Sequence, residues 1–491
     1  MKTLIYYSIT ILMIALSFGL SNAIAAPQIS IYTDSSLYQA GDTIEVSLEA
    51  PYPGPEAVYV DVYIGLLNPD GVLYTLSQDG WTEGINTPWI ENYYLRYGRH
   101  LDSCFRFLLP CDIPPINEPG EFFFLAALTR AGTTDLLGCI DSAGFLAGMP
   151  QATDYYVDAE CGNDKNYGME DAPWRSITRA LCSIDSLEGI PTTIHIAPGT
   201  YTWCGDGETF PLEMKSWVSL IADEPGAIID ADDSDANVIL AEDVHNAAID
   251  GFTITGAILS GHLKSHAGGG ICCLDSSILI TNNTIIENTG SGYGGGGIYC
   301  GGGSPEIMNN VISWNKVDCI DESDRGGGIY CRNSAARIVN NTIANNEAQW
   351  GGGIYIYAYS YEIAVREISN NTIVNNIASI GAGIYLSGIS TEITDCVIWE
   401  DSVGSKTMLD YVSASFCCVK GGYLGEGNID LDPQFGGELI SGFRYYLRPG
   451  SPCIDAGSRS AEEAGLSGMT AQMDGTPDTG TVDMGAHYPI P

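Results

Sequence analysis

The chain has 491 residues, and its 61 aspartate and glutamate side chains outnumber 20 lysine and arginine side chains, giving a formal net charge of −41. Repulsion between like charges argues against nucleic acid as a partner and against simple electrostatic capture of polyanions. The length allows two or three domains, and the 59 glycines suit a β protein that is rich in turns.

Residues 1–25 have the pattern of a secretory signal peptide. Lys2 gives a short basic start, residues 4–20 are almost wholly apolar, and Ala23-Ile24-Ala25 is a small-x-small cleavage site. A retained membrane anchor is the rival interpretation of this stretch. No later stretch stays apolar for about 18 residues, so we expect no transmembrane helix. The sequence thus predicts export, with the protein secreted or held at the cell surface, the outer membrane included.

Residues 26–150 contain no repeat and predict a small β-sandwich. Short strand-forming runs are separated by proline and glycine, a spacing typical of such domains. The run from Tyr38 to Leu48 is similar to accessory β-sandwich domains at the front of exported bacterial proteins. The expected strands are Ile29–Tyr32, Thr43–Leu48, Val58–Ile64, Val72–Leu76 and Phe122–Leu128.

A group of aromatic residues lies in one long connection of this domain. Two interpretations are open: a platform that stacks on sugar rings, or a packed loop, which is favoured because aromatic side chains are usually part of a core. The group consists of Trp81, Trp89, Tyr93, Tyr94 and Tyr97.

Residues 151–250 open the next domain. A strand is expected at Asp154–Asp158, followed by a helix that has Pro173 in its first turn and an apolar stripe running from Ile177 to Leu187. Such a helix would cap the open end of a solenoid, which otherwise exposes unpaired strand edges.

Residues 251–400 repeat two signatures at intervals between 25 and 31 residues. One is a glycine run that leads into a strand, as in Gly295-Gly296-Gly297-Ile298. The other is a pair of asparagines between aliphatic residues, as in Ile338-Val339-Asn340-Asn341-Thr342-Ile343. In the strand that follows this glycine run, Ile298 and Cys300 alternate with Tyr299, so the isoleucine and cysteine point inward and the tyrosine points outward.

One copy cannot bury its inward face alone, whereas stacked copies bury it continuously. Asparagine suits the turns between strands because it tolerates left-handed backbone angles and its amide can bond to the next coil. The sequence therefore predicts an all-β chain: a parallel β-helix with a short N-terminal capping helix, preceded by the β-sandwich. Residues 151–250 would form the N-terminal cap and first coils, and residues 401–491 the last coils and the C-terminal cap.

These copies resemble the repeats of the right-handed parallel β-helix superfamily, to which pectate lyases and polygalacturonases belong. The span of about 80 residues that begins with residues 154–181 and continues through residues 193–201 and 208–222 resembles an uncharacterised domain that opens many bacterial β-helices of this kind. The resemblance implies the fold, while the activity stays open because one scaffold hosts many functions. The four sequence blocks of polygalacturonases are missing except for weak echoes at Asp232-Asp233 and Ser260-Gly261-His262, so that activity is rejected.

The 15 cysteines all follow the signal peptide, and their odd number leaves at least one unpaired. Cys273, Cys300 and Cys331 occupy equivalent positions in the repeat. The favoured interpretation is a buried stack of small apolar thiols, and the alternative is a disulfide within this stack.

A polysaccharide lyase of this superfamily would need Ca²⁺ to bridge carboxylates to an acidic sugar, and a lysine or arginine as base. Lys264 and Arg325 are the candidate bases, because both lie just before a glycine run. The candidate Ca²⁺ ligands are Asp230, Asp232, Asp233 and Asp235, with Asp474, Asp478 and Asp483 as a second set. A solvated loop charge or acidic turn is the simpler interpretation of each.

Two functions remain. The favoured one is an exported or cell-surface β-helix protein that binds carbohydrate or another surface ligand without catalysis. The alternative is a Ca²⁺-dependent polysaccharide lyase or another carbohydrate-active enzyme. Convergence of the basic and acidic candidates within about 6 Å would favour the enzyme. The candidate ligand-stacking residues are an outward ladder of tyrosines that could stack on sugar rings or merely cover the sheet: Tyr299, Tyr330, Tyr355 and Tyr385.

Overall fold

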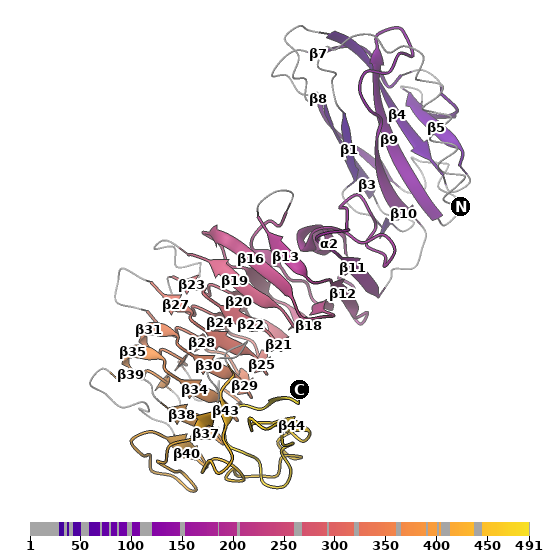
Figure 1. Ribbon diagram of the computed structural model, residues 1–491. Coiled ribbons are helices and arrows are strands. Elements are labelled where there is room, and N and C mark those ends of the chain that lie inside the picture. Colours follow the sequence, from indigo (N-terminus) through magenta and orange to yellow (C-terminus); the bar gives the residue numbers. More distant parts are fainter. Residues whose placement is uncertain are drawn as a thin grey trace. The chain divides into compact units, whose positions relative to one another are not determined.

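The fold is seen in a computed structural model (Figure 1), which describes residues 29–33, 37–38, 43–50, 58–68, 71–77, 80–85, 88–95, 101–108, 120–147, 153–184, 186–203, 207–259, 268–291, 294–318, 324–359, 365–388, 391–399, 402–403, 413–436 and 444–490. The predicted signal peptide and Lys264 lie outside these residues. The chain divides into two compact units. One holds Met1–Ala152, Gly162–Trp174 and Cys182–Asp185, and the other holds Thr153–Cys161, Arg175–Leu181 and Ser186–Pro491. In the described residues, no helix is long and apolar enough to cross a membrane.

The first unit contains two sheets that share one apolar core, as predicted for a β-sandwich. All pairs are antiparallel except that of β2 with β10. The smaller sheet has the order β1 (Ser30–Thr33), β3 (Thr43–Ala50), β8 (Leu101–Leu108). The larger has the order β2 (Leu37–Tyr38), β10 (Asp141–Ala147), β9 (Gly120–Arg130), β4 (Val58–Leu67), β5 (Leu73–Ser77), β6 (Gly80–Glu83), with β7 (Ile90–Leu95) also on β4. Alternate residues of both sheets, such as Val46 and Phe124, meet in the core.

The aromatic group of this unit supports its core. Trp81, Trp89 and Tyr93 pack against the buried residues, which favours the packed interpretation, while the Tyr94 ring is tilted at 50° against the Tyr59 ring, with 5.0 Å between ring centroids. Tyr97 lies outside the described residues. The expectation of a single long connection was wrong, because β6 and β7 pair with β5 and β4 there.

The second unit is a parallel β-helix (Figure 1), as the repeats predicted. The strands of its coils pair with equivalent strands of neighbouring coils, which lie about 4.8 Å apart. The ten-stranded sheet comprises β11 (Asp154–Val157), β12 (Thr192–Ile196), β15 (Val218–Ala222), β18 (His245–Asp250), β21 (Ser277–Thr281), β25 (Glu306–Met308), β29 (Arg337–Val339), β33 (Glu367–Ser369), β37 (Glu392–Thr394) and β40 (Ser413–Ser415). The nine-stranded sheet comprises β13 (Gly199–Thr202), β16 (Ala227–Ser234), β19 (Thr253–Ala257), β22 (Thr284–Ile286), β26 (Val311–Ser313), β30 (Thr342–Ala344), β34 (Thr372–Val374), β38 (Val397–Trp399) and β41 (Cys418–Val419).

Two further sheets contribute strands to some of the coils. The seven-stranded sheet follows the glycine runs and comprises β14 (Leu212–Glu213), β17 (Ile239–Glu242), β20 (Ile271–Leu274), β24 (Ile298–Gly301), β28 (Ile329–Arg332), β32 (Ile354–Tyr357) and β36 (Ile384–Ser387). The five-stranded sheet comprises β23 (Thr289–Gly290), β27 (Lys316–Val317), β31 (Glu347–Trp350), β35 (Ile377–Ile380) and β39 (Ser402–Val403). The inward residues stack in register as buried isoleucine columns, one of them being Ile280, Ile307, Ile338, Ile368 and Ile393.

The two asparagines of each pair divide the tasks that the sequence predicted for them. The first, such as Asn309 with φ of 59°, takes the left-handed conformation at the turn. The second is buried and bonds to both neighbouring coils. The Asn310 backbone N–H donates to Asn341 Oδ1 at 2.9 Å, and Asn310 Nδ2 donates to the Ile280 carbonyl at 2.8 Å. A second buried ladder, which the sequence analysis missed, consists of Asn288, Asn315, Asn346 and Asn376.

The helix of this region, α2 (Ile177–Ser183), is shorter than expected and begins four residues after Pro173, so the prediction of its first turn was wrong. Its first N–H groups are capped by a residue that is distant in sequence. The Glu208 carboxylate accepts hydrogen bonds from the N–H groups of Ile177 and Thr178, both at 2.7 Å. The apolar stripe is buried from Ile177 onward but does not reach Leu187, which is 41% exposed.

The C-terminal segment packs along the coils as well as after them. It contains two short antiparallel strand pairs, β42 (Phe435–Gly436) with β43 (Tyr446–Leu447) and β44 (Met469–Thr470) with β45 (Tyr488–Pro489). Residues 483–488, here called the C-terminal strap, run back across three coils (Figure 1). The Ala486 N–H donates to Thr372 Oγ1 at 2.9 Å, and Asn340 exchanges hydrogen bonds with the His487 backbone. The predicted cap is therefore fastened to the turns that carry the asparagine pairs.

Candidate functional site

The predicted tyrosine ladder lies on the outer face of the seven-stranded sheet. Tyr299, Tyr330, Tyr355 and Tyr385 are in register on consecutive strands, with ring centroids between 4.9 and 5.4 Å apart. The rings pack mainly on one another, so the first three are only 4%, 2% and 6% exposed, and Tyr385 is half-buried. Burial raises the pKa of the Tyr299 and Tyr355 hydroxyls. The ladder therefore offers little free ring surface and mostly covers its sheet.

An exposed group continues this face beside the ladder. Two residues after the tyrosine column, the outward positions are Gly301, Arg332 and Tyr357, again in register. At Gly301 a Cβ atom would lie 2.9 Å from the Tyr299 ring, so glycine leaves room for that ring to lie across its strand. Tyr299 also hydrogen-bonds to Arg332.

Arg332, Tyr357 and Tyr359 form what we call the arginine–tyrosine cluster. Arg332 donates to the Tyr359 hydroxyl at 3.0 Å, and its guanidinium lies 5.8 Å from the centroid of the Tyr359 ring. The hydrogen bond from Arg332 lowers the pKa of Tyr359. Tyr357 meets the same ring edge to face at 4.9 Å, and Asn333 Oδ1 accepts a hydrogen bond from the Tyr359 N–H. Tyr359 is thus 67% exposed yet held on several sides.

The sequence analysis missed this cluster, although alternation along β28 and β32 already places Arg332 and Tyr357 on the outer face. Of the two candidate bases, Arg325 lies on this face, because its guanidinium is 5.8 Å from the centroid of the Tyr355 ring. The structure therefore brings together Arg325 and the tyrosine ladder. Lys264 lies outside the described residues.

The acidic candidates lie elsewhere in the β-helix. Asp230 is on β16 and accepts a hydrogen bond from the Asp232 N–H at 2.9 Å, while Asp232, Asp233 and Asp235 are exposed. Asp235 precedes β17 and Arg325 precedes β28, three coils later, which is a separation of roughly 14 Å along the axis. Arg325 and these four aspartates thus do not converge. The Ca²⁺ site at these four aspartates stays a prediction.

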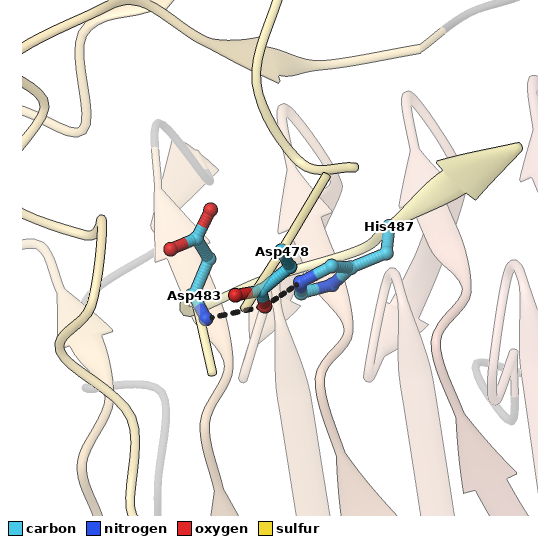
Figure 2. Close-up of side chains that lie close together, drawn as sticks. All are labelled: Asp478, Asp483 and His487. Carbon is cyan, nitrogen blue, oxygen red and sulfur yellow. Dashed lines mark hydrogen bonds and ion pairs between the residues drawn. The ribbon is translucent and has the colours of Figure 1, made fainter. Parts of the chain in front are cut away.

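One group of three potential metal ligands is found among the described residues, and it lies in the C-terminal cap (Figure 2). Ligand atoms of Asp478, Asp483 and His487 all lie within 4.8 Å of one another, and all three residues are buried. His487 Nε2 is 2.7 Å from Asp478 Oδ2, and His487 Nδ1 is 3.0 Å from the Gly485 carbonyl. Asp474, the third residue of the predicted set, is not in this group, and its carboxylate accepts from the Thr476 N–H.

The atoms of this group are already engaged within the protein. Asp478 Oδ2 also accepts from the Asp483 N–H, and the Asp483 carboxylate accepts from Asp455 N–H and Gln472 Nε2. Burial raises the pKa of Asp483. Both ring nitrogens of His487 thus lie within hydrogen-bonding distance of an acceptor oxygen. A metal ion would have to displace these hydrogen bonds, so the group acts as a buried polar network that holds the strap.

Comparisons with known proteins agree with the fold. Residues 229–414 match the family described as "Right handed beta helix region", and residues 160–229 match "Protein of unknown function (DUF1565)". No curated protein matches. The coils are therefore those of a right-handed parallel β-helix, as the resemblance of the repeats implied.

Solved structures similar to parts of this chain have low scores. The alkylpurine DNA glycosylase AlkC of Pseudomonas fluorescens is 13% identical over 25% of this chain and 30% of its own, with a TM-score of 0.19. The CARDB domain of the PF1109 protein of Pyrococcus furiosus is 10% identical over 26% of this chain and 97% of its own, with a TM-score of 0.17. The sporulation control protein Spo0M of Bacillus subtilis is 17% identical over 26% of this chain and 51% of its own, also with a TM-score of 0.17.

Proposed function

The middle of this chain is a right-handed parallel β-helix, and from this premise we propose that the protein is exported or held at the cell surface and binds carbohydrate without catalysis. The observation that carries the proposal is Tyr359, an exposed ring held in place beside Arg332 and Tyr357 on the outer face of the β-helix. A sugar ring presents C–H groups that pack on an aromatic face, and hydroxyl groups that accept from a guanidinium.

The cluster is suited to binding because its parts are ordered before a ligand arrives. The hydrogen bond from Arg332 and the edge contact of Tyr357 fix the Tyr359 ring, so less conformational entropy is lost on binding. Arg325 and Arg332 also place two positive charges on this face of a strongly acidic chain. Either a neutral or an acidic glycan fits this combination.

The separation of roughly 14 Å between Arg325 and the acidic turn at Asp235 favours binding over the alternative of a Ca²⁺-dependent lyase. An ultraviolet assay for unsaturated sugar ends, run with Ca²⁺ and with chelator, separates the two functions. We expect no product from any polysaccharide. Product that depends on Ca²⁺ and disappears in Lys264→Ala or Arg325→Ala would establish the lyase instead.

Binding is tested by pull-down of the full chain on insoluble neutral and acidic polysaccharides, followed by titration of the best one. We expect Tyr359→Ala to weaken binding about fivefold, because one aromatic stacking contact is worth on the order of 1 kcal/mol. The matched control is Tyr59→Ala, an exposed tyrosine of the β-sandwich. Failure to bind any polysaccharide, or equal binding by the Tyr359→Ala variant, would refute the proposal.

Export is supported by the signal pattern of residues 1–25. Its test is the N-terminal mass of the protein recovered from a secreting host. Cleavage after Ala25 is the expected result, whereas an intact N-terminus on a membrane-bound protein would favour the anchor.

A further inference from the structure

The larger sheet of the β-sandwich is hollowed on the face that points away from the core. Along β4 and β9 alternate residues such as Val62 and Phe124 point into the core, so the residues between them point to the opposite face. The cross-strand pairs on that opposite face are Asp61 with Thr129, Tyr63 with Ala127, and Gly65 with Leu125.

The middle of this face forms an apolar hollow. A Cβ atom at Gly65 would lie 3.1 Å from Leu73 Cδ1, so the glycine keeps the hollow open between β4 and β5. An apolar group that enters this hollow is removed from water, which favours its binding. The apolar lining residues are Gly65, Leu73, Ile85, Leu125, Ala127 and Ile140.

A buried hydroxyl group in the lining of this hollow lacks a partner. Thr129 is 0% exposed and lines the hollow, yet its Oγ1 makes no hydrogen bond to any described residue. A buried hydroxyl without a partner is costly, and such groups are rare in folded proteins. Thr129 therefore indicates a ligand that supplies the missing hydrogen bond.

A polar hollow of about 750 Å³ continues the same face. Tyr63 lines both hollows, and Asp61 and Glu91 line the polar one. The two oxygens of the buried Asp61 carboxylate accept from the N–H groups of Asn92 at 2.8 Å and Gly132 at 2.7 Å, and each oxygen can accept a further bond. No lysine or arginine is among the described residues that line either hollow, so the ligand that fits has a positive charge.

We propose that this face of the β-sandwich binds a small primary amine with an apolar tail. The tail lies in the apolar hollow, and the ammonium group donates to Thr129 Oγ1 and to the Asp61 carboxylate. One ammonium group can reach both, because side chains directly opposite on paired strands have Cβ atoms about 5 Å apart. Glu91 adds charge attraction, and the Tyr63 ring offers a face to the cation.

The site is independent of the proposed carbohydrate site, since all its residues belong to the other compact unit. Its test is ligand-observed saturation-transfer NMR on the full chain, with hexylamine as the probe. We expect saturable binding of hexylamine and none of hexanoate, which has a tail of the same kind but the opposite charge. Methylamine, which lacks the tail, should bind at least about tenfold more weakly than hexylamine, because it buries little apolar surface.

Two variants then locate the site. Thr129→Val keeps nearly the same shape and should weaken hexylamine binding about fivefold, because the ammonium group loses one acceptor. It breaks no hydrogen bond within the described residues, so the melting temperature should not fall. Glu91→Gln should weaken binding about threefold, the effect of one exposed charge.

The matched controls are Thr82→Val on β6 and Glu49→Gln on β3, both at exposed positions of the same unit, which should bind hexylamine like the wild type. Absence of saturable hexylamine binding, equal binding of hexanoate, or unchanged binding by Thr129→Val would overturn the proposal. An equal loss in Glu49→Gln and Glu91→Gln would also overturn it, because the attraction would then belong to the acidic chain as a whole.

Discussion

The coils and the C-terminal cap of the β-helix are stabilised in different ways. In the coils, the same contact recurs over several consecutive coils: isoleucine on isoleucine, asparagine on asparagine and tyrosine on tyrosine. In the cap, polar contacts do not repeat, as between the buried His487 and Asp478 or between the half-buried Arg459 and Glu367. A repeat distributes its stability along the axis, whereas the cap depends on a few particular residues. The predictions below test this difference from the largest expected effect to the smallest.

The largest effect is expected where a ladder is broken at its middle. Asn341→Ala removes the acceptor of the Asn310 N–H and the donor to the Ile307 carbonyl, leaving buried polar groups without partners. We expect a loss of about 4 kcal/mol in the free energy of unfolding, measured by urea denaturation. The control is Asn345→Gly at a half-buried left-handed turn with φ of 58°, which should change stability by less than about 0.5 kcal/mol. Equal losses in both variants would mean that the ladder adds nothing beyond its turns.

The next effect concerns the network that holds the C-terminal strap. Asp478→Ala leaves the buried His487 ring without the acceptor of Nε2. We expect a loss of about 3 kcal/mol, because removing one partner of a buried polar pair leaves the other uncompensated. Hydrogen exchange should show the loss in residues 483–488 and little change in β28 and β32. A loss spread evenly over the coils would contradict the assignment of Asp478 to the strap.

A smaller effect, dependent on pH, is expected at Glu367, which links a coil to the cap. Burial opposes its ionisation, but hydrogen bonds from Ser369, Arg337 and Arg459 outweigh that effect and lower its pKa below 4.5. Its contribution is therefore fully present above pH 4.5 and is lost as pH falls through the lower folded pKa.

The test compares the wild type with Glu367→Gln in denaturation at pH 7 and at pH 3. We expect the variant to be less stable by about 1 kcal/mol at pH 7, and the difference to shrink at pH 3. Asp395 and Asp483, whose pKa values burial raises, act in the opposite direction, but both are present in each protein and largely cancel in the comparison. A difference that stays constant with pH would mean that the charge of Glu367 contributes nothing.

The contrast between repeating coils and non-repeating contacts also explains which parts of the fold could be predicted from the sequence. The β-helix, the division of tasks within the asparagine pair and the tyrosine register all follow from local patterns that recur, so each copy supports the interpretation of the others. The start of α2 could not be predicted in this way, because Glu208, about 30 residues further along, provides its capping contacts.

The candidate site was predicted only in part, for a related reason. Alternation places Tyr299, Tyr330 and Tyr355 on the outer face, but it cannot show that their rings cover one another. The position of the exposed Tyr359 ring is set by its contacts with Arg332 and Tyr357. These two residues lie on different coils, so the pattern of one strand does not reveal the contacts. In the cap, His487 was missed because nothing repeats there, and only the folded strap brings it to Asp478.

The most direct test of the proposed carbohydrate binding is a crystal structure of the protein with an oligosaccharide from the best polysaccharide of the pull-down. The account predicts a sugar ring stacked on Tyr359, with at least one hydroxyl group accepting a hydrogen bond from Arg332 or Arg325. A sugar bound on any other face, with Tyr359 uncovered, would contradict the assignment of the arginine–tyrosine cluster as the binding site.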